Sequence, residues 1–132
     1  MKVMLDTNIC IYLIKQQPPT VIERFLSQPV GEIGISSITA AELAYGVCKS
    51  RHASKNRHAL EQFLAPLEIA TFDPAAAWSY GRLRGQLETK GTLIGSMDML
   101  IAAHALSLGV RLVSNNLREF RRVPGLRLEN WV

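Results

Sequence analysis

Short apolar runs alternate with segments of helical periodicity along the chain. Residues 2–5 form an apolar run that stops at Asp6, which predicts a buried first strand. Residues 8–16 follow with apolar side chains at helical spacing, and Pro18 and Pro19 end that helix. The later expected strands cover residues 32–36, 67–72 and 110–113, with a last edge strand at 126–128.

The later expected helices cover residues 20–28, 37–47, 58–64, 74–89 and 96–108. Asp73 and Pro74 are typical of a helix start, and Gly109 is typical of a helix end. Strands that alternate with such helices predict an α/β fold with a mainly parallel sheet covered on both faces. Ligands bind beyond the carboxyl ends of such strands, so we expect the chemistry where strands end and helices begin.

The composition narrows the class of protein. A chain of 132 residues, 48% of them hydrophobic, is long and apolar enough to form one globular domain over residues 1–132. It contains neither a membrane-length apolar stretch nor a secretory signal, which predicts a cytoplasmic protein without a membrane partner. Cys10 and Cys48 lack metal or disulfide spacing and are expected to be buried thiols. The net charge of +4 gives only weak support for a polyanionic partner.

Three acids stand at strand ends or at the start of an apolar helix: Asp6, Glu42 and Asp98. Each also has a purely structural explanation. Asp6 can cap a helix, Glu42 can complete a capping box with Thr39, and Asp98 can interact favourably with a helix dipole. A helix that instead begins at Ser37 places Glu42 a turn inside it, where an acid needs a partner.

That alternative helix has an expected apolar face made of Ile38, Ala41, Tyr45 and Cys48. Parallel topology brings Asp6 and Glu42 to one edge of the sheet. If Asp98 joins them, the three carboxylates repel one another unless they are protonated or bridged by a cation. Oxygen ligands of this kind suit Mg²⁺ or Mn²⁺ rather than zinc. Such a metal supports phosphodiester hydrolysis, because it polarises a phosphoryl oxygen and activates water.

Basic residues form two groups that fit a phosphate-bearing substrate, although a solvated charged surface is the alternative explanation for each. The first group follows the helix of Glu42, and the second surrounds the last buried strand. The first contains Lys49, Arg51, Lys55 and Arg57, and the second contains Arg111, Arg118, Arg121, Arg122 and Arg127. We expect RNA contacts from Lys49, Arg51, Arg118, Arg121 and Arg122.

Four blocks of sequence, spread in order from Met1 to Trp131, carry a family resemblance. They are MLDTN at 4–8, SSITAAEL at 36–43 with YG at 45–46, GSMDMLIAAHA at 95–105, and LVSNNLREF at 112–120 with VPGL at 123–126. Together they resemble the PIN-domain ribonucleases, and among these the VapC-type toxins of bacterial type II toxin–antitoxin systems.

The resemblance implies a three-layer α/β/α fold and an Mg²⁺-dependent endoribonuclease, with Mn²⁺ as a possible substitute. It implies that Asp6, Glu42 and Asp98 form the catalytic, metal-binding core, with Thr7 and Asn8 supporting Asp6. It also implies a homodimer, open to higher toxin–antitoxin assembly and silenced by a cognate VapB-type antitoxin. Relatives with the same Asn-Asn-x-Arg-Glu-Phe ending cut the anticodon stem-loop of initiator tRNA. We therefore expect a tRNA substrate, with a ribosomal RNA loop as the alternative.

The sequence departs from the family pattern at two places. Many PIN domains have a fourth acid just after the strand that ends here at Ser114, where this chain has Asn115 and Asn116. Either Glu119 supplies the fourth carboxylate, directly or through water, or Asn116 serves as a neutral polar ligand. Ser114 and Asn116 are expected to support the site. The second departure is Ser96, which replaces the usual proline and is expected to cap its helix.

The missing fourth acid supports a rival hypothesis, a catalytically weak PIN-like module that binds nucleic acid or a partner. The intact trio of acids argues for the enzyme. His104, in the middle of an apolar helix, is expected to be a packed core histidine.

Overall fold

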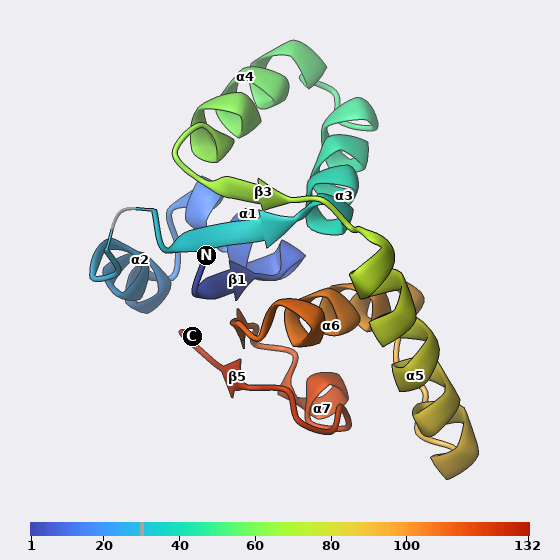
Figure 1. Cartoon of the computed structure of the whole chain (residues 1–132). Coiled ribbons are helices and arrows are strands. Elements are labelled where there is room, and N and C mark those ends of the chain that lie inside the picture. The colour runs from blue at the N-terminus through green and yellow to red at the C-terminus, as the bar shows by residue number, and fades with distance from the viewer. Residues whose placement is uncertain (30) are drawn as a thin grey trace.

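The computed structural model, which describes residues 1–29 and 31–132, is built around a parallel sheet (Figure 1). Its strands are β1 (Val3–Leu5), β2 (Ile33–Ser36), β3 (Glu68–Ala70), β4 (Arg111–Val113) and β5 (Leu128–Glu129). They are ordered β3-β2-β1-β4-β5, and every neighbouring pair is parallel. The predicted α/β class and parallel sheet are confirmed, and β1 lies at the centre of the sheet.

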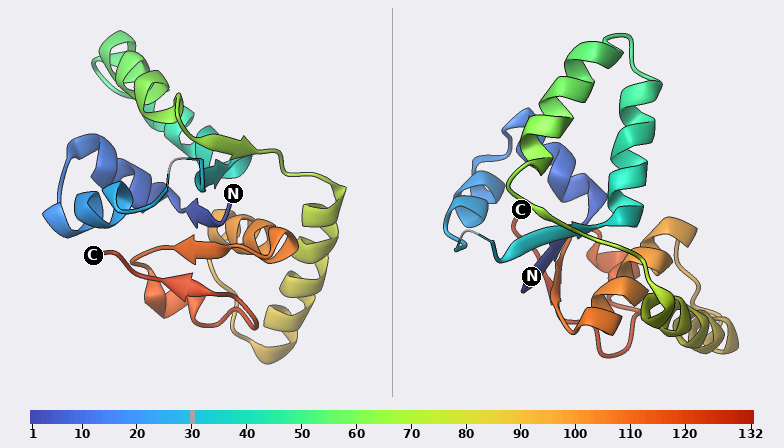
Figure 2. Two further views of the ribbon diagram at one scale, coloured as in Figure 1. Left: turned by 60° about the vertical axis from the view of Figure 1, so that its left-hand side comes forward. Right: turned by 45° about the horizontal axis from the view of Figure 1, so that its top comes forward.

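Helices cover both faces of the sheet. They are α1 (Thr7–Lys15), α2 (Pro19–Leu26), α3 (Ser37–Cys48), α4 (Ala53–Leu64), α5 (Pro74–Lys90), α6 (Ser96–Leu108) and α7 (Leu117–Phe120). Figure 2 shows α3 and α4 on the opposite side of the molecule from α5. None of these helices is long and apolar enough to span a bilayer within the part of the chain that the structure describes.

The alternation of side chains along β1 and β4 divides the core into two layers. Met4 and Leu112 face a cluster that contains residues of α5 and α6, such as Leu83 and Ile101. The neighbouring Val3, Leu5 and Val113 face a second cluster, formed with side chains of α1 to α4 and with Trp131. The fold is therefore a three-layer α/β/α arrangement, as the resemblance implied.

Several predicted helix ends are confirmed by their caps. The Asp6 carboxylate accepts a hydrogen bond from the Ile9 N–H, and the Asp73 carboxylate accepts one from Ala76. The residue after α6 is Gly109, with φ of +66°, a left-handed conformation that costs glycine little. Gly95, not Ser96, occupies the N-cap of α6, so the expected cap at Ser96 is wrong.

The environment of α3 differs from the expectation. Its N-cap is Ser36, whose Oγ accepts a hydrogen bond from the Ile38 N–H, so the capping box of Thr39 and Glu42 does not form. The expected apolar face is also wrong. Thr39 and Leu43 are the buried positions, whereas Tyr45 is 65% exposed. The reason is tertiary, because α3 packs against both α1 and α4 and these neighbours decide which face is covered.

Three further details were not anticipated. Helix α4 begins at Ala53, five residues earlier than predicted, and the short helix α7 was not predicted. Cys10 is buried as expected, but Cys48, the last residue of α3, is exposed. The mostly exposed position of α4 explains the first error, because few of its residues are apolar enough to reveal the helical period.

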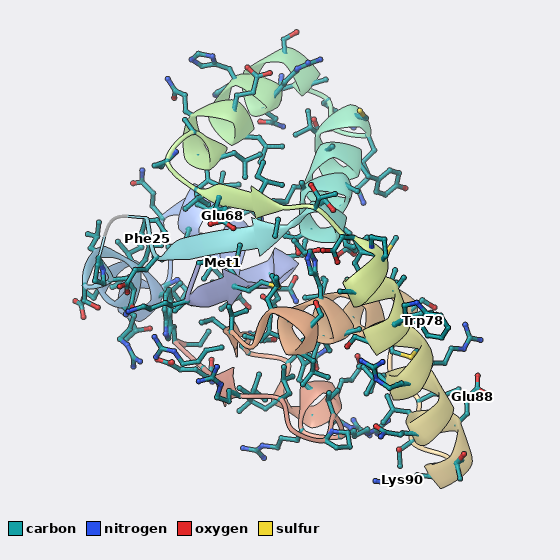
Figure 3. All side chains as sticks on the ribbon, in the orientation of Figure 1. Met1, Phe25, Glu68, Trp78, Glu88 and Lys90 are labelled. Atoms are coloured by element: carbon teal, nitrogen blue, oxygen red, sulfur yellow. The ribbon has the colours of Figure 1, made fainter. Side chains whose placement is uncertain are left out.

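Gly34 allows β2 and β3 to approach closely. A Cβ atom at this position would lie 2.6 Å from the Glu68 carbonyl oxygen and 2.3 Å from the terminal carbon of Met1. Figure 3 shows Met1 and Glu68 beside these strands, and the N-terminal ammonium lies 3.3 Å from the Glu68 carboxylate. The sheet therefore requires a residue without a side chain at this point.

Gly34→Ala is expected to lower the free energy of unfolding by at least about 1–3 kcal/mol, because the new methyl group meets backbone that cannot move away. Gly81→Ala, in exposed α5 with nothing within 4 Å of the new Cβ, is the matched control and should raise stability by about 0.5–1 kcal/mol. Denaturant unfolding measures both values. Equal effects of the two substitutions would contradict the packing argument.

Candidate active site

Acidic and polar side chains meet at the carboxyl edge of the three neighbouring strands β2, β1 and β4. Asp6 directly follows β1, and Ser114 directly follows β4. Glu42 lies in α3, which begins where β2 ends, and Asp98 lies in the first turn of α6. Because parallel strands end at the same edge, residues far apart in the sequence are brought together here.

Asp6 is the most buried of these acids, with 3% of its surface exposed. Its backbone N–H donates to the Val113 carbonyl over 3.0 Å, and its carboxylate caps α1. Burial raises the pKa of Asp6 from 3.8 to about 6, even though hydrogen bonds from Ser114 and the Ile9 N–H lower it. Charge on Asp6 is therefore costly unless a cation compensates for it.

Glu42 is held by Thr7, whose hydroxyl donates to the Glu42 carboxylate over 2.6 Å. The resemblance implied that Thr7 supports Asp6, but the structure pairs it with Glu42 instead. Asn8 is exposed in the first turn of α1. Its expected support of Asp6 stays a prediction.

Asn116 joins two acids that come from different segments. Its side-chain Nδ2 donates to Asp98 over 3.1 Å and to Glu119 over 3.2 Å. The Gly95 N–H also donates to Glu119, over 3.4 Å. Glu119 therefore reaches the neighbourhood of Asp98, and Asn116 acts there as a hydrogen-bond donor. Glu119 is therefore the carboxylate placed to be the fourth acid, and whether it or Asn116 acts as the ligand stays a prediction.

Ser114 connects this group to Asp6. It is fully buried, its Oγ accepts the Asn116 N–H over 2.9 Å, and it hydrogen-bonds Asp6. Through Ser114 and Asn116, the segment after β4 contacts three acids: Asp6, Asp98 and Glu119. The sequence identified both residues as supporting, although their hydrogen-bond partners were not foreseeable from spacing.

The four acids influence one another electrostatically. Burial, followed by the hydrogen bond and charge of Glu119, raises the pKa of Asp98 from 3.8 to about 7, and Asp6 and Glu42 add to this rise. The hydrogen bond with Asp98 in turn lowers the pKa of Glu119. The raised pKa values of Asp6 and Asp98 are typical of a functional site, and a bound cation would favour the charged forms of both carboxylates.

The donor chemistry fits a divalent cation that prefers oxygen ligands. Yet no three His, Cys, Asp or Glu side chains within residues 1–29 and 31–132 lie close enough together to hold a metal ion as they stand. Glu42 is engaged with Thr7, and Glu119 with Asn116 and Gly95. Metal binding would therefore require these side chains to rearrange slightly.

The basic residues do not form one surface. Arg111 opens β4, at the end opposite the acids, and pairs with Glu129, while Arg127 donates to the Gly109 carbonyl. Arg122 lies beside the site, because its charge helps to lower the pKa of Glu119. Arg118 and Arg121, in and just after α7, are exposed. Lys49 and Arg51 are exposed beyond the far end of α3.

Comparison with known proteins identifies the family. The protein-family model described as "PIN domain" matches residues 3–126. The chain belongs to the PIN domain family. Within this family the chain is 50% identical over 132 residues to "Ribonuclease VapC2" of Haemophilus influenzae, covering 100% of this chain and 99% of that protein. It is 46% identical over 131 residues to the "tRNA(fMet)-specific endonuclease VapC" of Salmonella typhimurium, covering 99% and 98%. These relatives make it a VapC-type PIN domain.

Solved structures agree with this assignment. The chain matches the structure of DNA-bound VapBC from Salmonella typhimurium with a TM-score of 0.95 at 45% identity, covering 100% of this chain and 99% of that one. It matches VapBC2 from Rickettsia felis with a TM-score of 0.91 at 46% identity over the whole of both chains. PIN nucleases generally depend on a divalent metal ion, which is consistent with the donor set of this PIN domain.

Asp6→Asn is expected to stabilise the metal-free protein at high pH, because asparagine still accepts the Ile9 N–H but carries no charge. The raised pKa means that the stability contributed by Asp6 is present below about pH 4 and is lost as the pH rises through about 6. In EDTA at pH 8, the free energy of unfolding of Asp6→Asn should exceed that of the wild type by about 1–3 kcal/mol. This difference should fade toward pH 4.

Denaturant unfolding at several pH values measures this difference. Asp73→Asn, the same exchange at the exposed N-cap of α5, shows how much the substitution changes stability where no acid cluster is present. A wild type that equals or exceeds Asp6→Asn in stability at pH 8 would show that the burial of this charge is not unfavourable.

Proposed function

We propose that this VapC-type PIN domain is the toxin of a toxin–antitoxin pair. Its activity is that of an Mg²⁺-dependent endoribonuclease that cuts initiator tRNA in the anticodon stem-loop. The grouping of Asp6, Asp98 and Glu119 around Ser114 and Asn116 carries the proposal, because burial and neighbouring charge make the ionisation of Asp6 and Asp98 unfavourable without a cation. The printed name of the Salmonella typhimurium relative supports the tRNA substrate.

In this proposal Asp6, Asp98 and Glu42 hold the ion, and Glu119 completes the set. When bound, Mg²⁺ polarises the scissile phosphate and lowers the pKa of a water molecule. The protein's own contribution is to keep the acids at one edge of the sheet. Thr7 orients Glu42, and Asn116 orients both Asp98 and Glu119. The raised pKa values of Asp6 and Asp98 favour metal binding and activity that increase as the pH rises from about 6 to 8.

RNA contact is proposed for the basic residues on the α7 side, because Arg122 already lies beside Glu119. Arg118 and Arg121 extend the same positively charged surface for phosphate contact. Lys49 and Arg51 lie at the far end of α3 and would reach only a more distant part of a long RNA.

The proposed protein partners are a VapB-type antitoxin and a second copy of this chain. The solved relatives are VapBC complexes, which supports the antitoxin. An apolar pocket of about 290 Å³ between α1, α3 and α4 is lined by residues that include Ile14, Leu43 and Leu60, together with Glu42. An antitoxin segment seated there would reach the candidate active site. Tyr45 on α3 and Trp78 on α5 are exposed aromatic side chains that suit a dimer surface, and Figure 3 shows Trp78 pointing away from the body.

The direct test incubates the purified toxin, free of antitoxin, with total bacterial RNA in Mg²⁺ or in EDTA. Cleavage is expected only with the metal. Asp6→Asn and Asp98→Asn should each lower the rate at least about 100-fold, the size of loss that follows removal of one electrostatic stabiliser from an active site. Thermal unfolding of each variant checks that it is folded.

Sequencing of the released RNA ends tests the substrate. Ends within the anticodon stem-loop of initiator tRNA support the proposal, and ends in a ribosomal RNA loop refute its substrate. Expression of the wild type should also stop growth, whereas expression of Asp98→Asn should not. Cleavage that persists in EDTA and in both variants would refute the metal mechanism, whereas an absence of cleavage under every condition would leave the catalytically weak binding module as the better hypothesis.

Glu119→Gln distinguishes the two candidates for the fourth ligand position. If Glu119 approaches the ion, the variant should bind Mg²⁺ or Mn²⁺ ~3- to 100-fold more weakly, as is common when groups around a metal are lost. Titration calorimetry measures the change. Glu88→Gln, which removes an exposed acid paired with Arg84 on α5, is the matched control. Equal affinities would remove Glu119 from the site.

A further inference from the structure

One buried hydrogen bond joins α6 to the start of α3. His104, 1% exposed, has its ring Nδ1 2.8 Å from the Oγ of Ser36. The two residues are 68 positions apart in the sequence, and Ser36 itself is fully buried. A polar contact in such a position stabilises one relative placement of the two helices, because separating it leaves buried polar atoms without partners.

The contact lies on the two helices that carry two of the acids. Glu42 follows Ser36 by six residues along α3, and Asp98 precedes His104 by six residues along α6. At 1.5 Å per residue, each acid is roughly 9 Å along its helix from the contact. Any change in how α6 lies against the start of α3 therefore changes the separation of Asp98 from Glu42.

The surroundings of the contact are rigid. The Oγ of Ser36 also accepts the Ile38 N–H and so fixes the first turn of α3. Phe72 packs edge-on against the imidazole, with ring centroids 5.3 Å apart and planes at 76°. The Phe72 N–H donates to the Oγ of Ser37, which ties the segment after β3 to the same point.

Electrostatic repulsion between acids opposes this contact. Glu42 on α3 and Asp98 on α6 repel each other when both are charged and no cation lies between them. Burial keeps the imidazole of His104 uncharged at neutral pH by lowering its pKa, against smaller opposing effects of Asp73 and the Thr71 backbone. The imidazole therefore adds no charge of its own to the electrostatic interactions between α3 and α6.

We propose that His104 is a positioning residue. Through Ser36, it fixes α6 against α3 and so sets the spacing of Asp98 and Glu42 for the metal ion. This inference rests on the proposed metal-dependent function. It predicts a specific defect, a weaker affinity for the divalent cation in a protein that is still folded.

His104→Leu removes the hydrogen bond but fills the apolar site with a side chain of similar volume. Calorimetry with Mn²⁺ or Mg²⁺ alone should show affinity ~3- to 10-fold weaker than that of the wild type, at or below the loss for groups that touch metal ligands directly. RNA cleavage should need correspondingly more metal, with kcat largely restored at saturating metal. His104→Asn, which can place a polar atom near the position of Nδ1, should recover most of the affinity.

Ser79→Ala is the matched control. The Ser79 hydroxyl on α5 donates to the Ala103 carbonyl on α6 over 2.8 Å. This variant therefore also removes one buried hydrogen bond made to α6, but the bond joins α6 to α5, which carries none of the acids. Its metal affinity should equal that of the wild type. Ser36→Ala removes the His104 contact from the other side and should reproduce the defect of His104→Leu even if the latter folds poorly.

The proposal is overturned if His104→Leu and Ser36→Ala bind metal as the wild type does, or if Ser79→Ala weakens binding as much as they do. Failure of the proposed function has a different signature. In that case the wild type binds the cation but leaves RNA uncut, and the calorimetric comparison of the variants still decides the role of His104.

Discussion

The burial of negative charge at the carboxyl edge of the sheet is the constraint on which the rest of the site depends. Asp6 follows the central strand β1 and is almost inaccessible, so its charge loses hydration that the local hydrogen bonds only partly replace. Asp98 experiences the same cost together with the repulsion of its acidic neighbours. A fold that only had to be stable would place neutral or apolar residues here. The cost is understandable in a site made for a cation.

Hydrogen bonds from neighbouring side chains determine how the acids share the free-energy cost of burying negative charge. Three side chains act as donors to the acids: Ser114 to Asp6, Thr7 to Glu42, and Asn116 to both Asp98 and Glu119. The amide of Asn116 holds two carboxylates near each other without adding charge. These donors keep the acids as separate, solvated or hydrogen-bonded groups in the metal-free protein, which explains why they do not converge into a finished metal cluster. A bound cation would attract the carboxylates and so bring them together.

The two sides of the molecule have different physical character. The α7 side presents arginines near Glu119, which suits a polyanion. The side formed by α1, α3 and α4 presents an apolar pocket that includes Glu42. If RNA binds on the α7 side and a protein partner binds in the pocket, as proposed, the two reach one group of acids by separate routes. Glu42 lines the pocket and accepts the Thr7 hydroxyl at the site, so it is where the two kinds of binding would compete.

The sequence by itself determined the order of the strands and of every helix except the short α7, because the apolar runs and the end signals at Asp73 and Gly109 are local. It also predicted Asp6, Glu42 and Asp98 as site residues, the first two because strand ends in a parallel sheet share an edge. Only the tertiary structure decided the rest. The buried face of α3 depends on α1 and α4, and the pairing of Thr7 with Glu42 depends on how α1 lies against α3. The contact of His104 with Ser36 spans 68 residues, and no periodicity encodes it. Local patterns record which side chains prefer burial, whereas hydrogen-bond partners are chosen by elements that meet only after folding.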